Sequence, residues 1–285
     1  MRVGVGLPST LPGAGGRDTV EWARLADEGP FSSLGVLDRL LYSSLDPMTA
    51  LAAAAAVTRR VRLATTIVIG PMRNTVLLAK TAASLHAIAD GRLVLGLAVG
   101  ARKEDYDAAG VDFAGRGRRL SEQLFALRGI WEEGEIVPRH TGSPSGPPLL
   151  VGGLSDIGFA RVARYADGYV HGGGPPRAFA RAADKARAAW QDAGRSGKPE
   201  LWAQGYFALG DSEVAERGKE YLRRYYAFTG PFAEKIAAGL LMSPQSIAQF
   251  LRGYAEAGCD EMVLFPAVPG LDQLQALARV LEEGF

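Results

Sequence analysis

Short runs of aliphatic and β-branched residues alternate with longer helical patterns along the whole chain of 285 residues. This alternation is typical of repeated β-α units that build a parallel sheet. About eight strand-like runs can be recognised, at residues 3–7, 33–37, 61–68, 93–99, 149–151, 167–171, 201–207 and 262–265. Because eight parallel strands close a barrel, we expect an α/β fold, a single (β/α)8 TIM barrel that occupies residues 1–285 as one domain.

The segments between these runs show the spacing of amphipathic helices. Between the fourth and fifth strands, apolar residues recur every three to four positions, at Leu120, Leu124, Leu127 and Trp131. Such a stripe predicts a helix with one face against a sheet and the other in water. Residues 212–257 are long enough for an extra pair of helices before the last strand.

Several predicted helices also have start signals. Asp18 precedes the first helical pattern, Ser155 the fifth, and Ser243 with Pro244 a late one. Side chains of this kind cap the free amides of a helix N-terminus, and proline fits the first helical position. The longest irregular stretch, residues 136–148, is predicted to be a loop.

Composition excludes several classes of function. The net charge of +1, with acidic and basic residues interleaved, argues against a nucleic-acid partner. A single cysteine, Cys259, cannot form an internal disulfide framework or a cysteine-built metal site. No run approaches the roughly 20 apolar residues of a membrane span, and the first apolar run is too short for a signal sequence. We therefore expect a cytoplasmic protein with neither a membrane nor a nucleic acid as partner.

An α/β barrel performs its chemistry at the carboxyl ends of its strands. One such end is conspicuous, because the apolar run before Gly100 stops on glycine and continues into a polar segment from Arg102 to Tyr106. Glycine there lets a ligand approach the bare backbone. The residues that follow the other strands are Asp38 and Arg39, Thr66 and Ile67, Gly152 and Gly153 with Ser155, and His171.

Taken together, these segments resemble the bacterial luciferase-like family of flavin-dependent oxidoreductases, in a member of actinobacterial type. The resemblance rests on the order and spacing of motifs over almost the whole chain: Leu7-Pro8, Asp38-Arg39, residues 58–67, Arg73-Asn74, Ala79-Lys80, residues 85–100, residues 105–113, residues 151–153, residues 166–168 and residues 257–261. Each motif alone is weak, whereas their shared order is specific.

The resemblance implies a barrel that holds FMN or, alternatively, coenzyme F420, with the ring over the barrel mouth. It assigns cofactor contacts to Leu7, Thr66, Ile67, Gly100, Arg102, Gly152, Gly153 and Ser155. In this family a non-proline cis peptide commonly supports the ring, and the matching bond is Thr66–Ile67. The phosphate would lie at the helix that Ser155 caps, where free amides and the helix dipole favour an anion. From the residues alone, the two glycines could equally form a tight turn.

Three residues are candidates for catalysis. Asp38 could hold a ring or substrate group, or pair with Arg39. Many relatives have histidine where this chain has Arg39, whose guanidinium does not titrate near neutral pH. His171 then becomes a candidate titratable group beside the substrate, or a structural histidine at the rim. Arg102 could neutralise a reduced flavin, or be a solvated loop charge.

The resulting expectation is a luciferase-like monooxygenase that uses reduced FMN and O2 on a small organic substrate. An F420-dependent reductase or dehydrogenase that transfers hydride is the alternative within the family, and a flavin-binding barrel without catalysis is the alternative of another class. Relatives imply a separate flavin or F420 reductase and a homodimer as partners. A nucleotide-hydrolase P-loop is not supported, because Pro199 follows Gly194–Lys198 where serine or threonine is needed. A serine-hydrolase nucleophile elbow is not supported, because Gly142–Gly146 has proline where the serine would have to be.

Overall fold

The computed structural model describes residues 1–138 and 146–284; residues 139–145 of the predicted loop lie outside the described part. Nine parallel strands form its sheet: β1 Arg2–Gly6, β2 Ser33–Val36, β3 Arg62–Thr65, β4 Val68–Ile69, β5 Leu93–Ala98, β6 Leu149–Gly152, β7 Gly168–His171, β8 Glu200–Phe207 and β9 Glu261–Pro266. Their order is β3-β2-β1-β9-β8-β7-β6-β5-β4, and β3 also pairs with β5, which closes the sheet. Each of the eight predicted strands is confirmed.

The third predicted strand is divided in two. β3 ends at Thr65 and β4 begins at Val68, and the peptide bond between Thr66 and Ile67 is cis. Both pieces pair with β5, so together they fill one position of the barrel. The closed barrel therefore has eight strand positions, as predicted.

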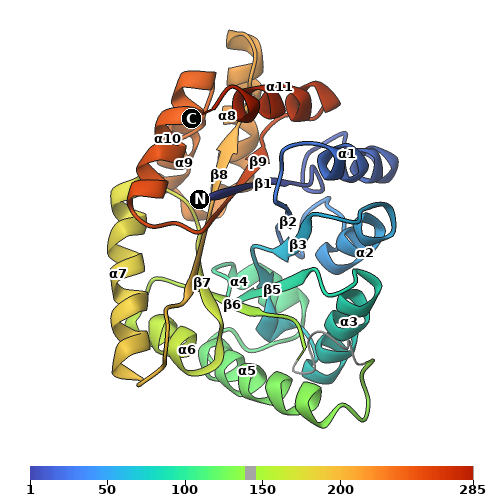
Figure 1. Cartoon of the computed structure of the whole chain (residues 1–285), viewed down its shortest axis with the longest axis vertical. Coiled ribbons are helices and arrows are strands. Elements are labelled where there is room, and N and C mark those ends of the chain that lie inside the picture. Colours follow the sequence, from blue (N-terminus) through green and yellow to red (C-terminus); the bar gives the residue numbers. More distant parts are fainter. Residues whose placement is uncertain (139–145, 285) are drawn as a thin grey trace.

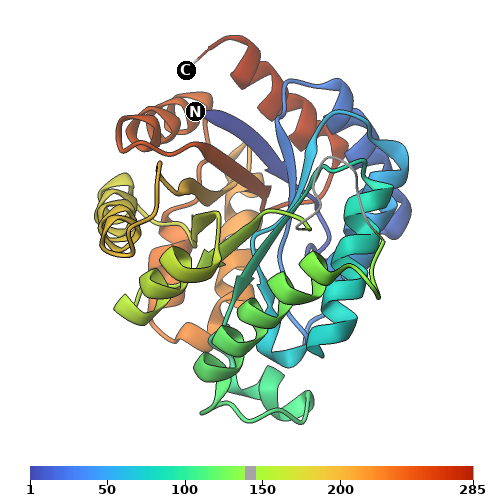
Figure 2. The same cartoon turned by 60° about the horizontal axis from the view of Figure 1, so that its bottom comes forward.

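Helices cover the outside of the barrel, as Figures 1 and 2 show. They are α1 Gly16–Glu28, α2 Pro47–Val57, α3 Thr75–Ile88, α4 Lys103–Ala108, α5 Arg116–Glu133, α6 Asp156–Tyr165, α7 Pro176–Asp192, α8 Ser212–Tyr225, α9 Phe232–Ala238, α10 Pro244–Glu256 and α11 Leu271–Glu282, with 3-10 turns η1 Gly70–Met72 and η2 Ala227–Thr229. The helices α8 and α9 pack on each other before α10, which confirms the predicted insertion. The polar segment after Arg102, expected to be a loop, forms α4.

Two of the three predicted start signals are confirmed. Ser155 caps α6 by accepting a hydrogen bond from the amide of Gly158, and Ser243 caps α10 in the same way. The prediction for Asp18 was wrong by one turn: α1 begins at Gly16, and Asp18 lies within its first turn, where it accepts from the amide of Gly15. Its carboxylate completes a capping box instead of preceding the helix.

Side chains pack in two layers, one between the strands and the helices and one inside the barrel. Inside, large residues such as Trp202, near the start of β8, and Phe265, near the end of β9, fill the barrel. Glycines on β1 and β2 make this possible, since a Cβ on Gly6 would lie 2.0 Å from the ring of Phe265 and one on Gly35 2.6 Å from Val263. The interior is thus a packed core, and the barrel can hold a ligand only at its mouth.

A buried carboxylate ties the amino ends of the strands together. Glu261, at the start of β9, is fully buried and accepts hydrogen bonds from Nε of Arg2 and Oγ of Ser33, each at 2.6 Å. These partners come from β1, which pairs with β9, and from β2, which pairs with β1. This end of the barrel is therefore stabilised by charge, while the opposite end is left for the site. No helix in the described ranges is long and apolar enough to cross a membrane.

Candidate functional site

A cavity of about 160 Å³, called here the mouth cavity, lies at the carboxyl ends of β2, β4 and β5. It is lined by Leu37, Asp38, Arg39, Thr66, Ile67, Ile69, Gly100, Ala101, Arg102, Asp105, Gln204, Tyr225, Tyr226 and Phe228. Six of the residues predicted from the sequence meet here. They come from three segments that are far apart in the chain, and the parallel strands bring their ends to one edge.

Asp38 holds the wall of this cavity together. Its carboxylate accepts a hydrogen bond from the amide of Ile69 at 2.9 Å and lies 3.2 Å from Nη2 of Arg73. Arg73 also pairs with Asp46 at 2.9 Å. Burial raises the pKa of the Asp38 carboxyl, and the charge of Arg73 offsets part of that effect. Asp38 thus pairs with Arg73. The sequence analysis had considered a pairing of Asp38 with Arg39 instead.

Arg39 lies in a group of aromatic rings. Its guanidinium carbon is 4.5 Å from the ring centroid of Tyr42, 4.8 Å from that of Tyr225 and 5.8 Å from that of Phe228. One Nη donates to the carbonyl of Tyr225, while the buried Nε has no hydrogen-bond partner. Burial lowers the pKa of Arg39, and the nearby charge of Arg102 adds to the shift. Rings of this kind stabilise a cation without neutralising it.

Arg102 is the second cation of the cavity. Its side chain is only 14% exposed, and its guanidinium carbon lies 5.4 Å from the Phe228 centroid. The carboxylates of Glu104 and Asp105 approach it to 3.9 and 4.0 Å, too far for hydrogen bonds. Both Nε and Nη1 of Arg102 are buried without a hydrogen-bond partner. Arg102 is therefore not a freely solvated loop charge.

Thr66, Ile67 and Gly100 form the apolar wall of the cavity. Thr66 is buried, and Ile67 packs against the residues of the barrel interior. Gly100 has a φ of +66°, and a Cβ there would lie 2.9 Å from Ile69. Both the conformation and the close approach favour glycine at this position.

Gly152, Gly153 and Ser155 do not line the mouth cavity but follow the next strand, β6. Gly152 lies beside the end of β5, since a Cβ on it would be 3.3 Å from that of Ala98. The chain then turns through Gly153, with a φ of +146°, into the capped N-terminus of α6. This turn is exposed to solvent at the same edge of the barrel.

Two residues predicted for the site lie elsewhere. The side chain of Leu7 belongs to the layer between strands and helices, although its amide bonds to Gly35. His171 is buried with its ring 5.8 Å from that of Phe179 in α7, and its Nδ1 is 3.1 Å from the hydroxyl of Tyr169. Burial lowers the pKa of His171 to about 4. Leu7 and His171 are thus not among the residues that line the mouth cavity, and their roles toward the cofactor and the substrate stay predictions.

The sequence analysis missed other residues of the cavity. Gln204 points into it from β8 with a buried Oε1 that has no hydrogen-bond partner. Tyr225, Tyr226 and Phe228 cover it from the end of α8 and from η2. Gln204 had a signal, because it is the one polar side chain between Trp202 and Phe207 in an otherwise apolar strand. The aromatic residues lie in a helix and a turn whose position the sequence does not define.

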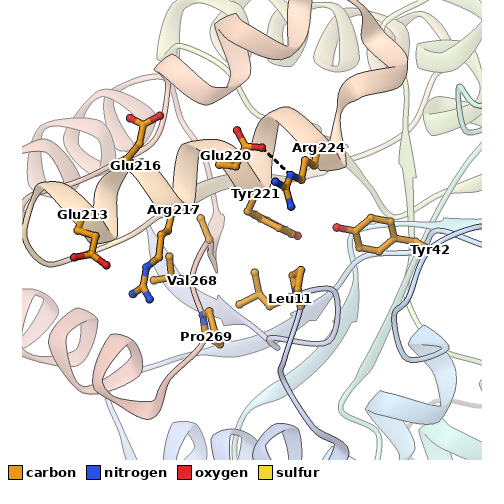
Figure 3. A pocket seen from close by; sticks show the side chains of 12 residues that line it. Leu11, Tyr42, Glu213, Glu216, Arg217, Glu220, Tyr221, Arg224, Val268 and Pro269 are labelled. Carbon is orange, nitrogen blue, oxygen red and sulfur yellow. Dashed lines mark hydrogen bonds and ion pairs between the residues drawn. The ribbon is translucent and has the colours of Figure 1, made fainter.

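A second, larger pocket of about 550 Å³ lies beside α8 and is called the α8 pocket (Figure 3). Leu11, Val268 and Pro269 supply an apolar floor, and charged side chains of α8 stand at its edge. Tyr42 and Tyr221 point toward each other across it. Since Arg39 lies over Tyr42, and the ring of Tyr221 is 5.6 Å from that of Tyr225, these tyrosines separate the two cavities.

Relatives of the chain are found both by sequence and by structure. An uncharacterized protein of Mycobacterium tuberculosis is 37% identical over 161 residues, which make up 53% of this chain and 56% of that protein. Pyrimidine monooxygenase RutA of Methylobacterium radiotolerans is 33% identical over 178 residues, 53% of this chain and 45% of that protein. The chain thus spans about half the length of the curated relatives it matches.

Two solved structures share the fold over nearly the whole chain. An F420-dependent secondary alcohol dehydrogenase, solved with an F420-acetone adduct, is 17% identical with a TM-score of 0.80 and covers 99% of this chain and 98% of its own. A type II Baeyer-Villiger monooxygenase of Pseudomonas putida, solved with FMN, is 18% identical with a TM-score of 0.72 and covers 99% and 96%. A family model described as luciferase-like monooxygenase matches residues 1–261. The chain therefore belongs to the luciferase-like monooxygenase family.

Proposed function

We propose that this protein is a flavin-dependent oxidoreductase, a luciferase-like monooxygenase that uses reduced FMN and O2 on a small organic substrate. The observation that carries the proposal is the mouth cavity, where Thr66, Ile67 and Gly100 form an apolar wall opposite two arginines. A flavin needs such a wall for its flat ring and donors for its carbonyl oxygens.

The polar atoms of the cavity fit this group. Three buried guanidinium nitrogens, Nε of Arg39 and Nε and Nη1 of Arg102, are donors without a partner. The buried Oε1 of Gln204 is an acceptor without a partner. The pyrimidine edge of a flavin presents carbonyl acceptors and one N–H donor, so it complements this set. Buried polar groups rarely remain unsatisfied in a protein that binds nothing.

When bound, reduced FMN supplies the electron pair that activates O2. The side chains of the protein support the ring, place charge beside it and exclude water. Thr66 and Ile67 support one face of the ring, and Arg39 and Arg102 place positive charge at the cavity. Tyr225, Tyr226 and Phe228 exclude water from it. A cavity of about 160 Å³ is small beside the roughly 300–1,000 Å³ of typical ligand pockets, so we expect Phe228 to move outward on binding.

For the phosphate, we propose the N-terminus of α6. The amides of Asp156 and Ile157 have no hydrogen-bond partner among the described residues and lie in the first turn of the helix. Gly152 and Gly153 precede this turn, and because they have no side chains an anion can approach the backbone there. The carboxylate of Asp156 is 88% exposed and pairs with Lys185 at 2.8 Å, so its charge is partly offset.

Hydride transfer with F420 is the second candidate. It is favoured by the TM-score of 0.80 to the F420-dependent dehydrogenase and by the two guanidinium groups, of Arg39 and Arg102, at the mouth. A barrel that binds flavin without catalysis is the third, since Arg39 stands where many relatives have histidine. We further propose a separate flavin or F420 reductase as partner and a homodimer formed through α2 and α3, where Leu77 is 68% exposed.

Titration of the cofactor-free protein with FMN and with F420, in separate experiments followed by fluorescence, tests the proposal. We expect tighter binding of FMN. Gly100→Ala should weaken that binding roughly tenfold, because the new Cβ meets Ile69 at 2.9 Å. Gly110→Ala is the matched control, with a similar φ of +65° and no atom within 4 Å of the added Cβ.

Tighter binding of F420 would replace the first candidate by the second, and binding of neither would remove both. Equal losses of FMN affinity in the two glycine variants would show that Gly100 does not lie at the cofactor. Stopped-flow reoxidation of the reduced, loaded protein separates catalysis from storage, since a storage protein would reoxidise at the same rate with every candidate substrate.

A further inference from the structure

We infer that Arg39 and Arg102 form a binding site for the carboxylate, or an equivalent planar oxyanion, of an organic substrate. The inference rests on the proposed function, because it assigns the chemical class of the substrate at the mouth cavity.

The two guanidinium groups share one ring. Their carbons lie 5.8 and 5.4 Å from the centroid of Phe228, and the charge of Arg102 acts on Arg39. Two cations placed together in a partly desolvated cavity repel each other. The aromatic faces relieve part of that cost, whereas an anion between the two groups would remove it.

The carboxylates around the cavity do not supply this anion. Asp38 is engaged by the amide of Ile69 and by Arg73. Asp105 accepts from the amide of Leu41 and stays 4.0 Å from Arg102. The remaining acceptor is the carbonyl of Tyr225, which is neutral and takes one Nη of Arg39. Three guanidinium nitrogens therefore stay buried without a hydrogen-bond partner among the described residues, and so does Oδ2 of the neighbouring Asp105. An oxyanion that enters the cavity would satisfy the guanidinium nitrogens directly.

The shape of the donors indicates what kind of anion enters. A guanidinium presents N–H groups in one plane, and this geometry matches the two oxygens of a carboxylate. The rings of Tyr225, Tyr226 and Phe228 line the same cavity as the two arginines. An acid with an aromatic or aliphatic body therefore fits the site better than a small inorganic ion does.

The cofactor could supply the same chemistry, because a reduced flavin is itself an anion. The test therefore measures two ligands. Benzoate and the isosteric, neutral benzamide are titrated calorimetrically into the full chain, with and without bound FMN, and FMN affinity is measured for every variant. The variants are Arg39→Gln, Arg39→Lys and Arg102→Gln.

Arg116→Gln is the matched control, since Arg116 also stacks on a phenylalanine, with its guanidinium carbon 3.7 Å from the Phe113 centroid, but lies outside the cavity. Thermal unfolding of each variant shows whether it folds. Arg39→Lys keeps the charge without the planar fork and keeps the test informative if Arg39→Gln does not fold.

We expect benzoate to bind the FMN-loaded protein at least tenfold more tightly than benzamide. Arg39→Gln and Arg102→Gln should lose this preference, Arg39→Lys should keep part of it, and Arg116→Gln should behave as wild type. Arg39→Gln and Arg102→Gln should also weaken FMN binding, because the proposed function gives the same nitrogens to the flavin, so the preference is measured with each variant saturated with FMN. Only Arg116→Gln should keep its FMN affinity within about threefold.

Equal binding of benzoate and benzamide, or the absence of both, would overturn the inference. So would a loss of FMN affinity in the arginine variants with benzoate binding intact, because the arginines would then serve the cofactor. If the protein binds neither FMN nor F420 but keeps the benzoate preference, the anion site stands and the proposed function fails.

Discussion

His171 shows at the scale of one residue how burial decides what a side chain can do. Its imidazole lies between β7 and α7, against Phe179, with the hydroxyl of Tyr169 at 3.1 Å from Nδ1. Burial lowers its pKa to about 4 from the ordinary histidine value of 6.5. The ring is therefore neutral at physiological pH and acts as a packing element of the layer between strands and helices.

This shift predicts a pH dependence of stability. The unfolded chain takes up a proton at His171 below about pH 6.5, whereas the folded protein does so only near pH 4. Stability should therefore fall as the pH is lowered between these values, by about 2 kcal/mol from pH 7 to pH 5 for this group. Urea unfolding of the wild type and of His171→Gln measures it. The variant should lose less stability than the wild type over this range, and equal losses would contradict the assignment.

The sequence analysis could not show that the side chains of Leu7 and His171 lie in the layer between strands and helices, and this has a physical reason. Strands of a closed parallel barrel are buried on both faces, so their sequences are apolar throughout and do not alternate. The sequence pattern then does not show whether a side chain points into the barrel or toward the helices. Gly6 and Gly168, which lie on the interior face, provide a usable signal, since Leu7 and His171 are one and three positions away and must point outward.

At the scale of elements, the sequence predicted the positions of the strands well and the residues at which they end less well. The eight strand positions follow from the alternation of short and long apolar segments. The break between β3 and β4 at Thr66–Ile67 has no signal in the residues, because threonine and isoleucine both favour an unbroken strand. Only the resemblance to the family indicated the cis bond. The position of η2 and its Phe228 could not be predicted from the sequence, because it depends on tertiary contacts with Arg39 and Arg102.

The capped N-terminus of α6 carries the second prediction. Ser155→Ala removes the hydrogen bond to the amide of Gly158 and should cost about 1 kcal/mol of stability. If the phosphate binds here, the variant should also lose affinity for FMN but not for riboflavin, which has no phosphate.

Ser243→Ala is the matched control, because Ser243 caps α10 through the amide of Ser246 at 3.2 Å and does not line the mouth cavity. It should lose stability and keep FMN affinity. Fluorescence titration measures the affinity of each variant for FMN and for riboflavin, and urea unfolding measures its stability. A parallel loss of riboflavin affinity in Ser155→Ala would show that the effect reaches the ring and not the phosphate.

On the scale of the whole molecule, the barrel divides its two tasks between its ends. Glu261 is fully buried at the amino ends of the strands and joins β9 to β1 and β2 through Arg2 and Ser33. Asp38 is nearly as buried at the carboxyl ends, where it holds Ile69 and Arg73 beside the mouth cavity. Two buried carboxylates thus sit at opposite ends of one closed sheet.

This arrangement gives the last prediction. Glu261→Gln should lower the free energy of unfolding by about 2 kcal/mol, because the side chain loses the charge that pairs with Arg2 and turns an N–H donor toward either Arg2 or Ser33, which are themselves donors. It should leave FMN affinity unchanged. Asp38→Asn keeps an acceptor for the amide of Ile69 but frees Arg73 toward the cavity, so FMN affinity should change with little loss of stability. Urea unfolding and FMN titration of both variants measure this. Equal effects on affinity would mean that the ends of the barrel are coupled through its core, since the packed interior between them would have to transmit the change.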